Sequence, residues 1–202
     1  MPIIKDIHDS DSRLVIWQID ESEEELHGGV KYVGNLPTNQ SRRLEKLAVL
    51  NLLNQLGYGY EYYYSAEGRP YLKTEKPDIS ISHAGNKVVL AASLNKAIGV
   101  DIEQTGRNYG RVASRYMTQR EISRLGTYGK NEMAFIWCVK EAVYKLPWGE
   151  SKNFGVDIEV FVDTLLSPKG WSDLKVLHND VWLNLRASYE YIDDYCLVWV
   201  NL

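Results

Sequence analysis

The sequence predicts an α+β protein made of two similar lobes, in each of which a helix packs on antiparallel strands. Two observations lead to this prediction. Strand-like runs follow one another through connections too short for a crossover helix. The order of a helical pattern followed by such strands also occurs twice along the chain. No Pro/Ser-rich linker separates the halves, so we expect lobes 1–98 and 99–202 to form one rigid unit.

The first lobe begins with a strand and a helix. Residues 14–19 alternate as a strand does, and leucines recur at helical spacing over residues 41–56, before Gly57. Residues 60–64 are rich in β-forming tyrosines. Three further strand-like runs follow with short connections, and we expect them to form an antiparallel meander: 78–82, 87–94 and 97–103.

The second lobe begins with helices and ends with strands. Helical patterns cover residues 112–116, 119–125 and 132–146, and Pro147 and Gly149 end the last of them. Strand patterns then cover residues 155–162, 181–189 and 196–201.

Composition narrows the class of protein. The 202 residues are 45% hydrophobic and 25% charged, which is typical of a globular chain. A net charge of −4 argues against a protein that coats nucleic acid, and no apolar run approaches the roughly 20 residues of a membrane helix. The first residues do not resemble a secretory signal, so we expect a cytoplasmic location. Cys138 and Cys196 lack metal-ligand spacing, so we expect two buried thiols.

Paired carboxylates are the first candidate site. In a strand over residues 99–103, Asp101 and Glu103 project from the same face. Two such carboxylates suit Mg²⁺, although the edge of a half-exposed strand is the commoner explanation of the pattern taken alone. Residues 155–159 repeat the same pentapeptide, with Asp157 and Glu159 in the matching places, so at most one copy need bind metal.

A lysine-bearing helix is the second candidate. At helical spacing Glu141 and Lys145 share one stripe with Trp137, and Lys140 lies on the next. A largely apolar helix that keeps these charges on one side suits a partly buried anion. A structural Glu141–Lys145 pair is the simpler alternative.

Two further groups of residues suit an anion or a base. Ser82 and His83 end a strand, and Arg69 lies shortly upstream, so the three offer donors to a phosphate. A structural histidine remains the alternative. Glu121 has capping-box spacing from Thr118, which predicts a helix N-terminus and leaves a role as a base open.

Five motifs in order resemble the phosphopantetheinyl transferase superfamily, and most closely its monomeric, surfactin-synthetase-activating type. They are Gly-Arg-Pro-Tyr-Leu (68–72), Ile-Ser-His (81–83), Gly-Val-Asp-Ile-Glu (99–103), Glu121 and Trp-Cys-Val-Lys-Glu-Ala-Val-Tyr-Lys (137–145). The resemblance implies two lobes related by a pseudo-twofold, with coenzyme A bound in a cleft between them. It also implies Mg²⁺-dependent transfer of 4′-phosphopantetheine from coenzyme A to a serine of an apo acyl or peptidyl carrier protein, releasing adenosine 3′,5′-bisphosphate.

The resemblance assigns roles to particular residues. It implies that Asp101, Glu103 and Glu141 hold the metal. Lys145 matches a lysine that contacts the pyrophosphate, with Lys140 a weaker candidate, and Glu121 matches a glutamate proposed as the base for the serine proton. The 3′-phosphate of coenzyme A is assigned to Arg69, Ser82 and His83.

The chain also departs from the family pattern. Leu50 stands where the family's first helix usually carries an arginine, and Arg42 or Arg43 would replace that contact with coenzyme A. A Gly-x-Gly stretch that the family shows after Lys145 is absent, so the thioester end of the substrate would lie differently.

The expected partners are coenzyme A and a carrier protein, with no nucleic acid and no membrane, and the protein is expected to be a monomer. Five arginines against one acid over residues 107–124 suggest a docking surface for an acidic carrier, although solvated helix faces explain them equally well. A degenerate relative that binds coenzyme A or a carrier without catalysis is the alternative function. A scaffold with purely structural charge pairs is a third.

Overall fold

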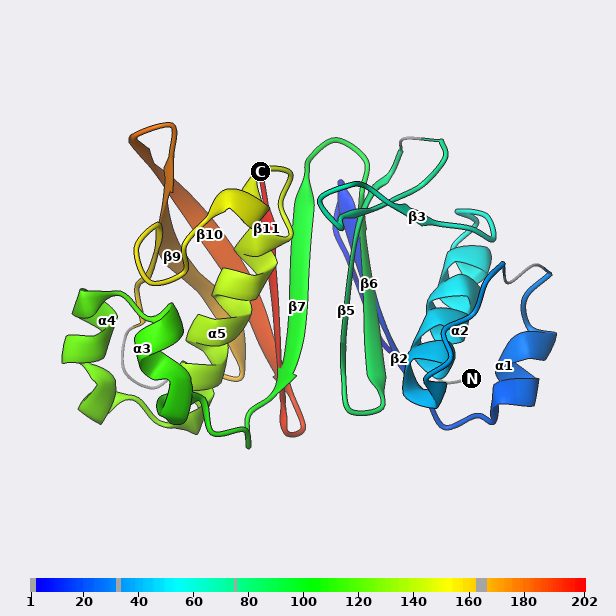
Figure 1. Ribbon diagram of the computed structural model, residues 1–202, viewed down its shortest axis with the longest axis horizontal. Helices are drawn as coiled ribbons and strands as arrows, with labels where there is room; N and C mark the ends of the chain where they lie inside the picture. The colour runs from blue at the N-terminus through cyan, green and yellow to red at the C-terminus, as the bar shows by residue number, and fades with distance from the viewer. Residues whose placement is uncertain (1–2, 32–33, 75, 163–166) are drawn as a thin grey trace. The chain divides into compact units, whose positions relative to one another are not determined.

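The computed structural model describes residues 3–31, 34–74, 76–162 and 167–202. The chain divides into two compact units, Met1–Ile98 and Gly99–Leu202, and each combines helices with a sheet of antiparallel strand pairs (Figure 1). The predicted α+β class is therefore confirmed, whereas the pseudo-twofold stays a prediction. None of the helices in these ranges has the length and apolar character needed to cross a membrane.

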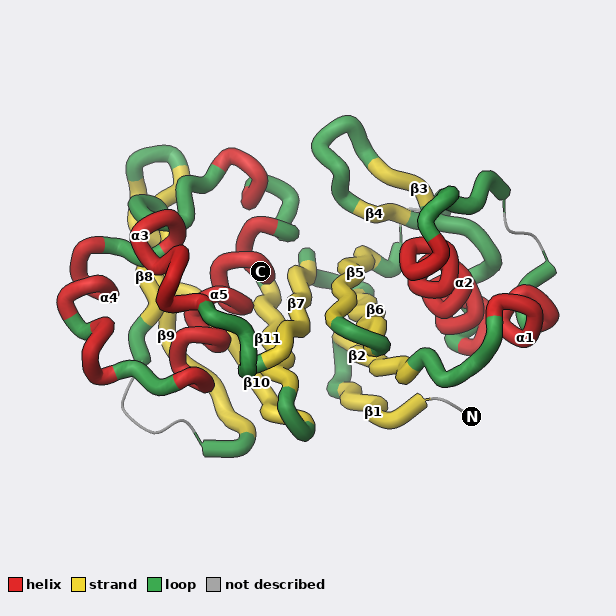
Figure 2. The backbone as a smooth tube through the Cα atoms, turned by 60° about the horizontal axis from the view of Figure 1, so that its bottom comes forward, coloured by secondary structure: helices red, strands yellow, loops and turns green. Residues whose placement is uncertain are grey.

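The first unit, Met1–Ile98, is built on a four-stranded sheet. Its strand order is β1 (Ile3–His8), β2 (Ser12–Gln18), β6 (Lys87–Ser93) and β5 (Asp78–Ala84). Two helices lie beside each other in this unit, α1 (Glu23–Gly28) and α2 (Gln40–Gln55) (Figure 2). The two-residue strands β3 (Tyr63–Tyr64) and β4 (Pro70–Tyr71) pair separately.

Helix α2 supplies the core of this unit. The Asn39 side chain accepts a hydrogen bond from the backbone N–H of Arg42 and so caps the helix N-terminus. Leucines at helical spacing, including Leu47 and Leu52, are fully buried where α2 contacts β2 and β6. The helix ends before Gly57, whose φ of +75° is a left-handed conformation that glycine adopts without strain.

The second unit, Gly99–Leu202, is built on a five-stranded sheet. Its order is β7 (Ile98–Gln104), β11 (Tyr195–Asn201), β10 (Val181–Ile192), β9 (Lys169–His178) and β8 (Ile158–Val160). The long helix α5 (Lys130–Tyr144) contacts β11 and β8. Short helical segments surround it: η1 (Tyr109–Val112), α3 (Ala113–Tyr116), α4 (Gln119–Ser123), η2 (Leu125–Thr127) and η3 (Gly149–Ser151).

The structure corrects the predicted meander. β5 and β6 form the expected antiparallel hairpin, but β7 does not pair with β6. Both edges of β6 are already occupied by β2 and β5, so β7 pairs with β11 instead. Strand 155–162 shrinks to Ile158–Val160 and strand 60–64 to Tyr63–Tyr64, and β1, α1 and β9 were not anticipated.

Candidate functional site

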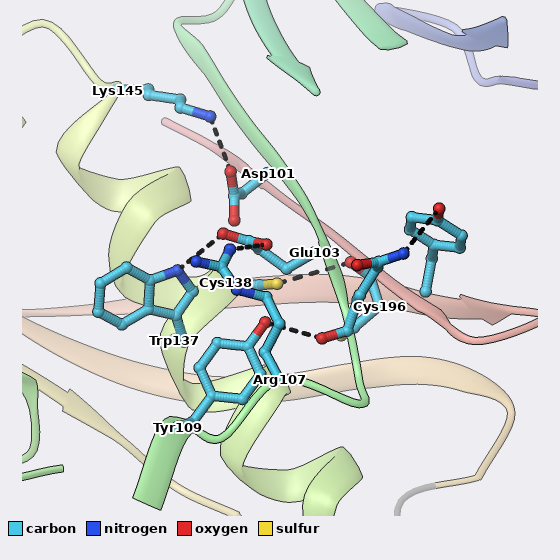
Figure 3. A network of polar contacts seen from close by, with 10 residues as sticks. Asp101, Glu103, Arg107, Tyr109, Trp137, Cys138, Lys145 and Cys196 are labelled. Carbon is cyan, nitrogen blue, oxygen red and sulfur yellow. Dashed lines mark hydrogen bonds and ion pairs between the residues drawn. The ribbon is translucent and has the colours of Figure 1, made fainter. Parts of the chain in front are cut away.

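Asp101 and Lys145 form an ion pair at one end of a polar cluster in the second unit (Figure 3). Asp101 lies on β7 and is 4% exposed. Its Oδ1 accepts a hydrogen bond of 2.8 Å from Lys145 Nζ, which also donates to the Val100 carbonyl at 2.9 Å. Lys145 is the C-cap residue of α5, so the bond ties the end of this helix to β7.

Glu103, two residues further along β7, is held from two sides. Its Oε1 accepts a hydrogen bond of 3.2 Å from the indole Nε1 of Trp137, and its Oε2 pairs with the Arg107 guanidinium. The Glu103 side chain is 14% exposed, whereas that of Arg107 is 57% exposed. Trp137 lies on α5, so this helix contacts both acids of the strand.

Glu141 is the third acid of the cluster. Burial raises its pKa to about 7, the charges of Asp101 and Glu103 add to the rise, and Lys145 opposes it. Burial also raises the pKa of Glu103, with a further contribution from Asp101. Because the charges of Asp101 and Glu103 act on Glu141, the three carboxylates lie near one another, and their role as metal ligands stays a prediction.

The backbone of β7 passes very close to α5 at this point. A Cβ atom on Gly99 would lie 1.9 Å from the carbonyl oxygen of Ala142, so no other residue fits without a shift of strand or helix. The repeated pentapeptide shows no such approach, because a Cβ on Gly155 would meet its nearest atom, the Met117 carbonyl oxygen, at 3.3 Å. The glycine therefore sets how near Asp101 lies to the helix.

The donor set fits a hard divalent cation in kind and charge. Within the ranges that the structure describes, no three His, Cys, Asp or Glu side chains stand arranged as a metal site. Two of the predicted ligands bond instead to protein cations, Asp101 to Lys145 and Glu103 to Arg107. Three carboxylates whose charges repel one another nonetheless match the ligand chemistry of Mg²⁺, which would relieve that repulsion.

The second copy of the pentapeptide has other contacts. Asp157 accepts a hydrogen bond of 2.8 Å from the backbone N–H of Asn153, and Glu159 pairs with Arg120 at 3.2 Å. A turn and a surface ion pair thus account for both carboxylates.

The predicted anion site of the first unit is divided among different places. Arg69 pairs with Asp78, which also accepts from the Ile98 N–H. Ser82 and His83 are successive residues of β5 and project from opposite faces; Ser82 is buried, and His83 is partly exposed. The structure therefore does not gather these three side chains on one face.

His83 lies instead with Arg42 at a pocket of about 320 Å³. The Arg42 guanidinium contacts the His83 ring and bonds to Glu45 at 3.2 Å. Further residues of the lining are Lys46, Tyr62 and Tyr64. Cations beside aromatic rings suit a phosphorylated nucleoside. Arg42 and His83, both predicted to contact coenzyme A, lie together at this pocket.

Two other positions of α2 bear on the predicted contact with coenzyme A. Arg43 forms a two-pronged ion pair with Glu23 of α1, at 2.9 and 3.0 Å, and donates to the Thr38 carbonyl. Leu50 is 2% exposed. Arg43 therefore joins the two helices of its unit, and its predicted contact with coenzyme A would need that ion pair to open.

Lys140 and Glu121 lie together inside the second unit, 2.7 Å apart from Nζ to Oε2. Both are buried, Lys140 at 0% and Glu121 at 1% exposure. Their proposed contacts with substrate stay predictions, and this structure presents neither group to solvent.

Sequence reasoning overlooked the partners of the candidate residues. Arg107 follows Glu103 by four residues, and Glu45 follows Arg42 by three on a helix, so opposite charges at short spacing were the available signal. From the sequence, Tyr62 and Tyr64 were interpreted only as β-forming residues. The periodicity of a strand does not indicate which of its side chains line a pocket.

Two comparisons with known proteins bear on this site. Residues 97–164 match the model of the 4′-phosphopantetheinyl transferase superfamily. A Haemophilus influenzae protein named "Putative 4'-phosphopantetheinyl transferase" is 30% identical over 129 residues, an alignment that covers 58% of this chain. The chain spans about half of that relative, 53% of its length. The chain is thus similar to this transferase superfamily over the segment that carries Asp101, Glu103 and Glu141.

Proposed function

We propose that this protein is a 4′-phosphopantetheinyl transferase of the surfactin-synthetase-activating type, with holo-acyl-carrier-protein synthase activity. The observation that carries the proposal is the cluster of Asp101, Glu103, Glu141 and Lys145, which lies within the segment that matches the superfamily. We place the enzyme in the cytoplasm as a monomer.

The proposed reaction modifies a carrier protein with part of coenzyme A. The Oγ of a carrier serine attacks the β-phosphorus of coenzyme A and forms a new P–O bond. The P–O bond to the bridging oxygen of the pyrophosphate breaks, and adenosine 3′,5′-bisphosphate leaves. The serine proton passes to a base or to water. Positioning and charge neutralisation supply most of the rate in phosphoryl transfer.

The residues of the second unit take the pyrophosphate end of coenzyme A. Asp101, Glu103 and Glu141 would hold Mg²⁺, which neutralises charge on the pyrophosphate when bound. Lys145 is partly exposed and donates to Asp101, and we assign its ammonium to a phosphate oxygen beside that acid. In the first unit, Arg42 and His83 take the 3′-phosphate in their pocket, and Arg69 and Ser82 are the remaining candidates.

The test is mass spectrometry of apo carrier proteins incubated with this protein, coenzyme A and Mg²⁺. We expect the mass of one phosphopantetheine on the carrier serine and its loss when a chelator is added. Binding of coenzyme A with no gain of mass on any carrier would favour the alternative, a degenerate relative without catalysis. The presence of all three carboxylates and Lys145 argues against that alternative.

The repeated pentapeptide provides a matched pair of variants. Asp101→Asn should reduce transfer at least 100-fold, because it removes a metal carboxylate and the charge that faces Lys145. Asp157→Asn should leave most of the activity, since Asp157 only bonds to a turn. Initial rates on one carrier measure both, and equal loss in the two variants would contradict the assignment.

A further inference from the structure

Every ammonium hydrogen of Lys140 has an acceptor inside the protein. Nζ donates to Glu121 Oε2 at 2.7 Å and to the carbonyl oxygens of Phe154 and Ile158 at 2.8 Å each. An ammonium has three hydrogens, so these bonds use all of them. Phe154 and Ile158 lie before and at the start of β8. Lys140 therefore ties α5 to that strand.

Both carboxylate oxygens of Glu121 also have hydrogen-bond partners inside the protein. Its Oε2 also accepts from the Thr118 N–H at 2.7 Å, and its Oε1 accepts from the Val160 N–H at 2.8 Å. The first bond belongs to the capping box of α4, and the second ends on β8. Both carboxylate oxygens thus have partners, and the pair with Lys140 connects α4, α5 and β8 at one buried point.

Such a pair does not stabilise a fold more than apolar side chains would. Burial lowers the pKa of Lys140, while the charges of Glu121 and Glu159 oppose that shift. Buried ion pairs generally recover little more than the cost of removing both charges from water, although losing one partner is strongly destabilising. The pair differs from apolar packing because its hydrogen bonds require particular directions and so fix where the two side chains point.

The direction matters because Glu141 follows Lys140 on the same helix. Successive residues of an α-helix point about 100° apart, so fixing the Lys140 side chain fixes the rotation of α5. That rotation sets where Glu141 points. It also sets where Lys145 and Trp137 meet Asp101 and Glu103.

We propose that Glu121 and Lys140 are positioning residues, whose buried pair fixes the rotation and depth of α5 and so holds Glu141, Lys145 and Trp137 at the carboxylates of β7. Neither residue exchanges a proton with the carrier serine, because all of their polar atoms are bonded within the protein. The inference rests on the proposed function for its kinetic consequence, but the geometry can be tested without turnover.

The main variant is the double substitution Glu121→Met/Lys140→Met, which leaves no lone buried charge. One readout is the NMR resonance of the Trp137 indole N–H, which donates to Glu103 and is assigned with Trp137→Phe. The others are kcat, KM for coenzyme A and the pH profile of kcat. The control is Arg186→Gln/Asp173→Asn, which breaks an exposed ion pair between β10 and β9 of the same unit.

If the pair positions α5, the double variant should show a shifted indole resonance and a kcat about tenfold below that of wild type. Its KM for coenzyme A should stay within threefold of the wild-type value, and the midpoints of its kcat–pH profile should not change. The control should behave like wild type in each measurement. If kcat falls more than about 100-fold and its pH profile no longer declines toward low pH, Glu121 acts as a base, and the inference is overturned. An unchanged indole resonance and kcat would overturn it too, leaving a purely structural role.

Two provisions keep the test decisive. If the double variant does not fold, Glu121→Gln, which keeps one oxygen for the Val160 N–H, is measured with the same readouts. If the wild-type protein transfers nothing to any carrier, the proposed function fails, and the indole resonance alone then decides whether the pair positions α5.

Discussion

At the scale of single residues, Glu141 is a proposed metal ligand whose burial lowers the stability of the folded protein. It is partly buried beside two other acids, and the charges of Lys145 and Arg107 offset part of their effect on its pKa. Ionising a carboxyl group that is partly buried beside two other acids costs free energy in the metal-free protein, and the raised pKa of Glu141 reflects this cost. Residues of this kind often lower stability where they serve function.

The raised pKa of Glu141 predicts a pH-dependent effect of Glu141→Gln. Between its ordinary pKa of 4.5 and the raised value of about 7, the folded protein holds a proton that the unfolded chain has released. The contribution of this group to stability is therefore complete below pH 4.5 and lost as pH rises through 7, with a slope of at most about 1.4 kcal/mol per pH unit. Relative to wild type, Glu141→Gln should be more stable at pH 8 than at pH 5.

Urea unfolding in the presence of a chelator measures this difference at the two pH values. Glu150→Gln is the control, because Glu150 is exposed shortly after the same helix. A stability difference between Glu141→Gln and wild type that does not change with pH would contradict the prediction. The variant should also lose transfer activity.

At the scale of elements, the contact of β7 with α5 decides the geometry of the carboxylates. Gly99→Ala would place a methyl group against the Ala142 carbonyl, and overpacking of this kind costs about 1–3 kcal/mol. We expect that loss of stability and a fall in transfer, since Asp101 must move with the strand. Gly155→Ala should cost less than about 1 kcal/mol, because its nearest neighbour lies at 3.3 Å.

Thermal and urea unfolding of the two alanine variants give the comparison. The matched pentapeptides make it direct, since each glycine precedes the same Val-Asp-Ile-Glu sequence. Similar losses of stability in the two variants would contradict the prediction that the close approach of β7 to α5 makes Gly99 the more sensitive position.

The elements show how far sequence patterns could lead. α2, α5, β6 and β10 have a clear helical or strand period, and their positions were predicted within a few residues. The partner of β7 could not be predicted, because β11 follows it by some ninety residues and pairing over that distance leaves no local pattern. β9 alternates buried and exposed residues, but the exposed Trp171 and the glycine beside it obscure that period.

The same limit applies to the candidate site. Spacing and the family resemblance suggested the three carboxylates and Lys145; the four residues lie near one another in the structure, and their functional role stays a prediction. The helical spacing of Lys140 could not reveal that its charge points inward, because its acceptors come from α4 and β8. Arg69 and His83 were grouped because they are close in sequence, whereas Asp78 and Arg42 are their partners in space.

At the scale of the whole molecule, a net negative protein carries a local positive surface. Arg111 and Arg115 are exposed, and no carboxylate in the described part of the chain pairs with either guanidinium. Arg107 and Arg120, by contrast, are paired with Glu103 and Glu159. Solvated arginines without acidic partners are suited to attract an acidic carrier protein.

Charge reversal tests this docking surface. Arg111→Glu/Arg115→Glu should raise KM for the carrier about tenfold or more at low salt and leave the affinity for coenzyme A unchanged. Arg186→Glu, on the exposed face of β10, is the control. Carrier kinetics that do not change at low salt would rule out the surface.

The two cysteines offer an experimental advantage of another kind. Cys138 and Cys196 are both buried, the Cys138 thiol bonds to the Cys196 carbonyl, and burial raises the pKa of Cys138. The thiolate is the nucleophile that attacks thiol reagents, so the two buried thiols should remain unlabelled under conditions that label an exposed cysteine within minutes. A cysteine introduced at an exposed position could therefore be labelled with a spectroscopic reporter while both native cysteines stay in place.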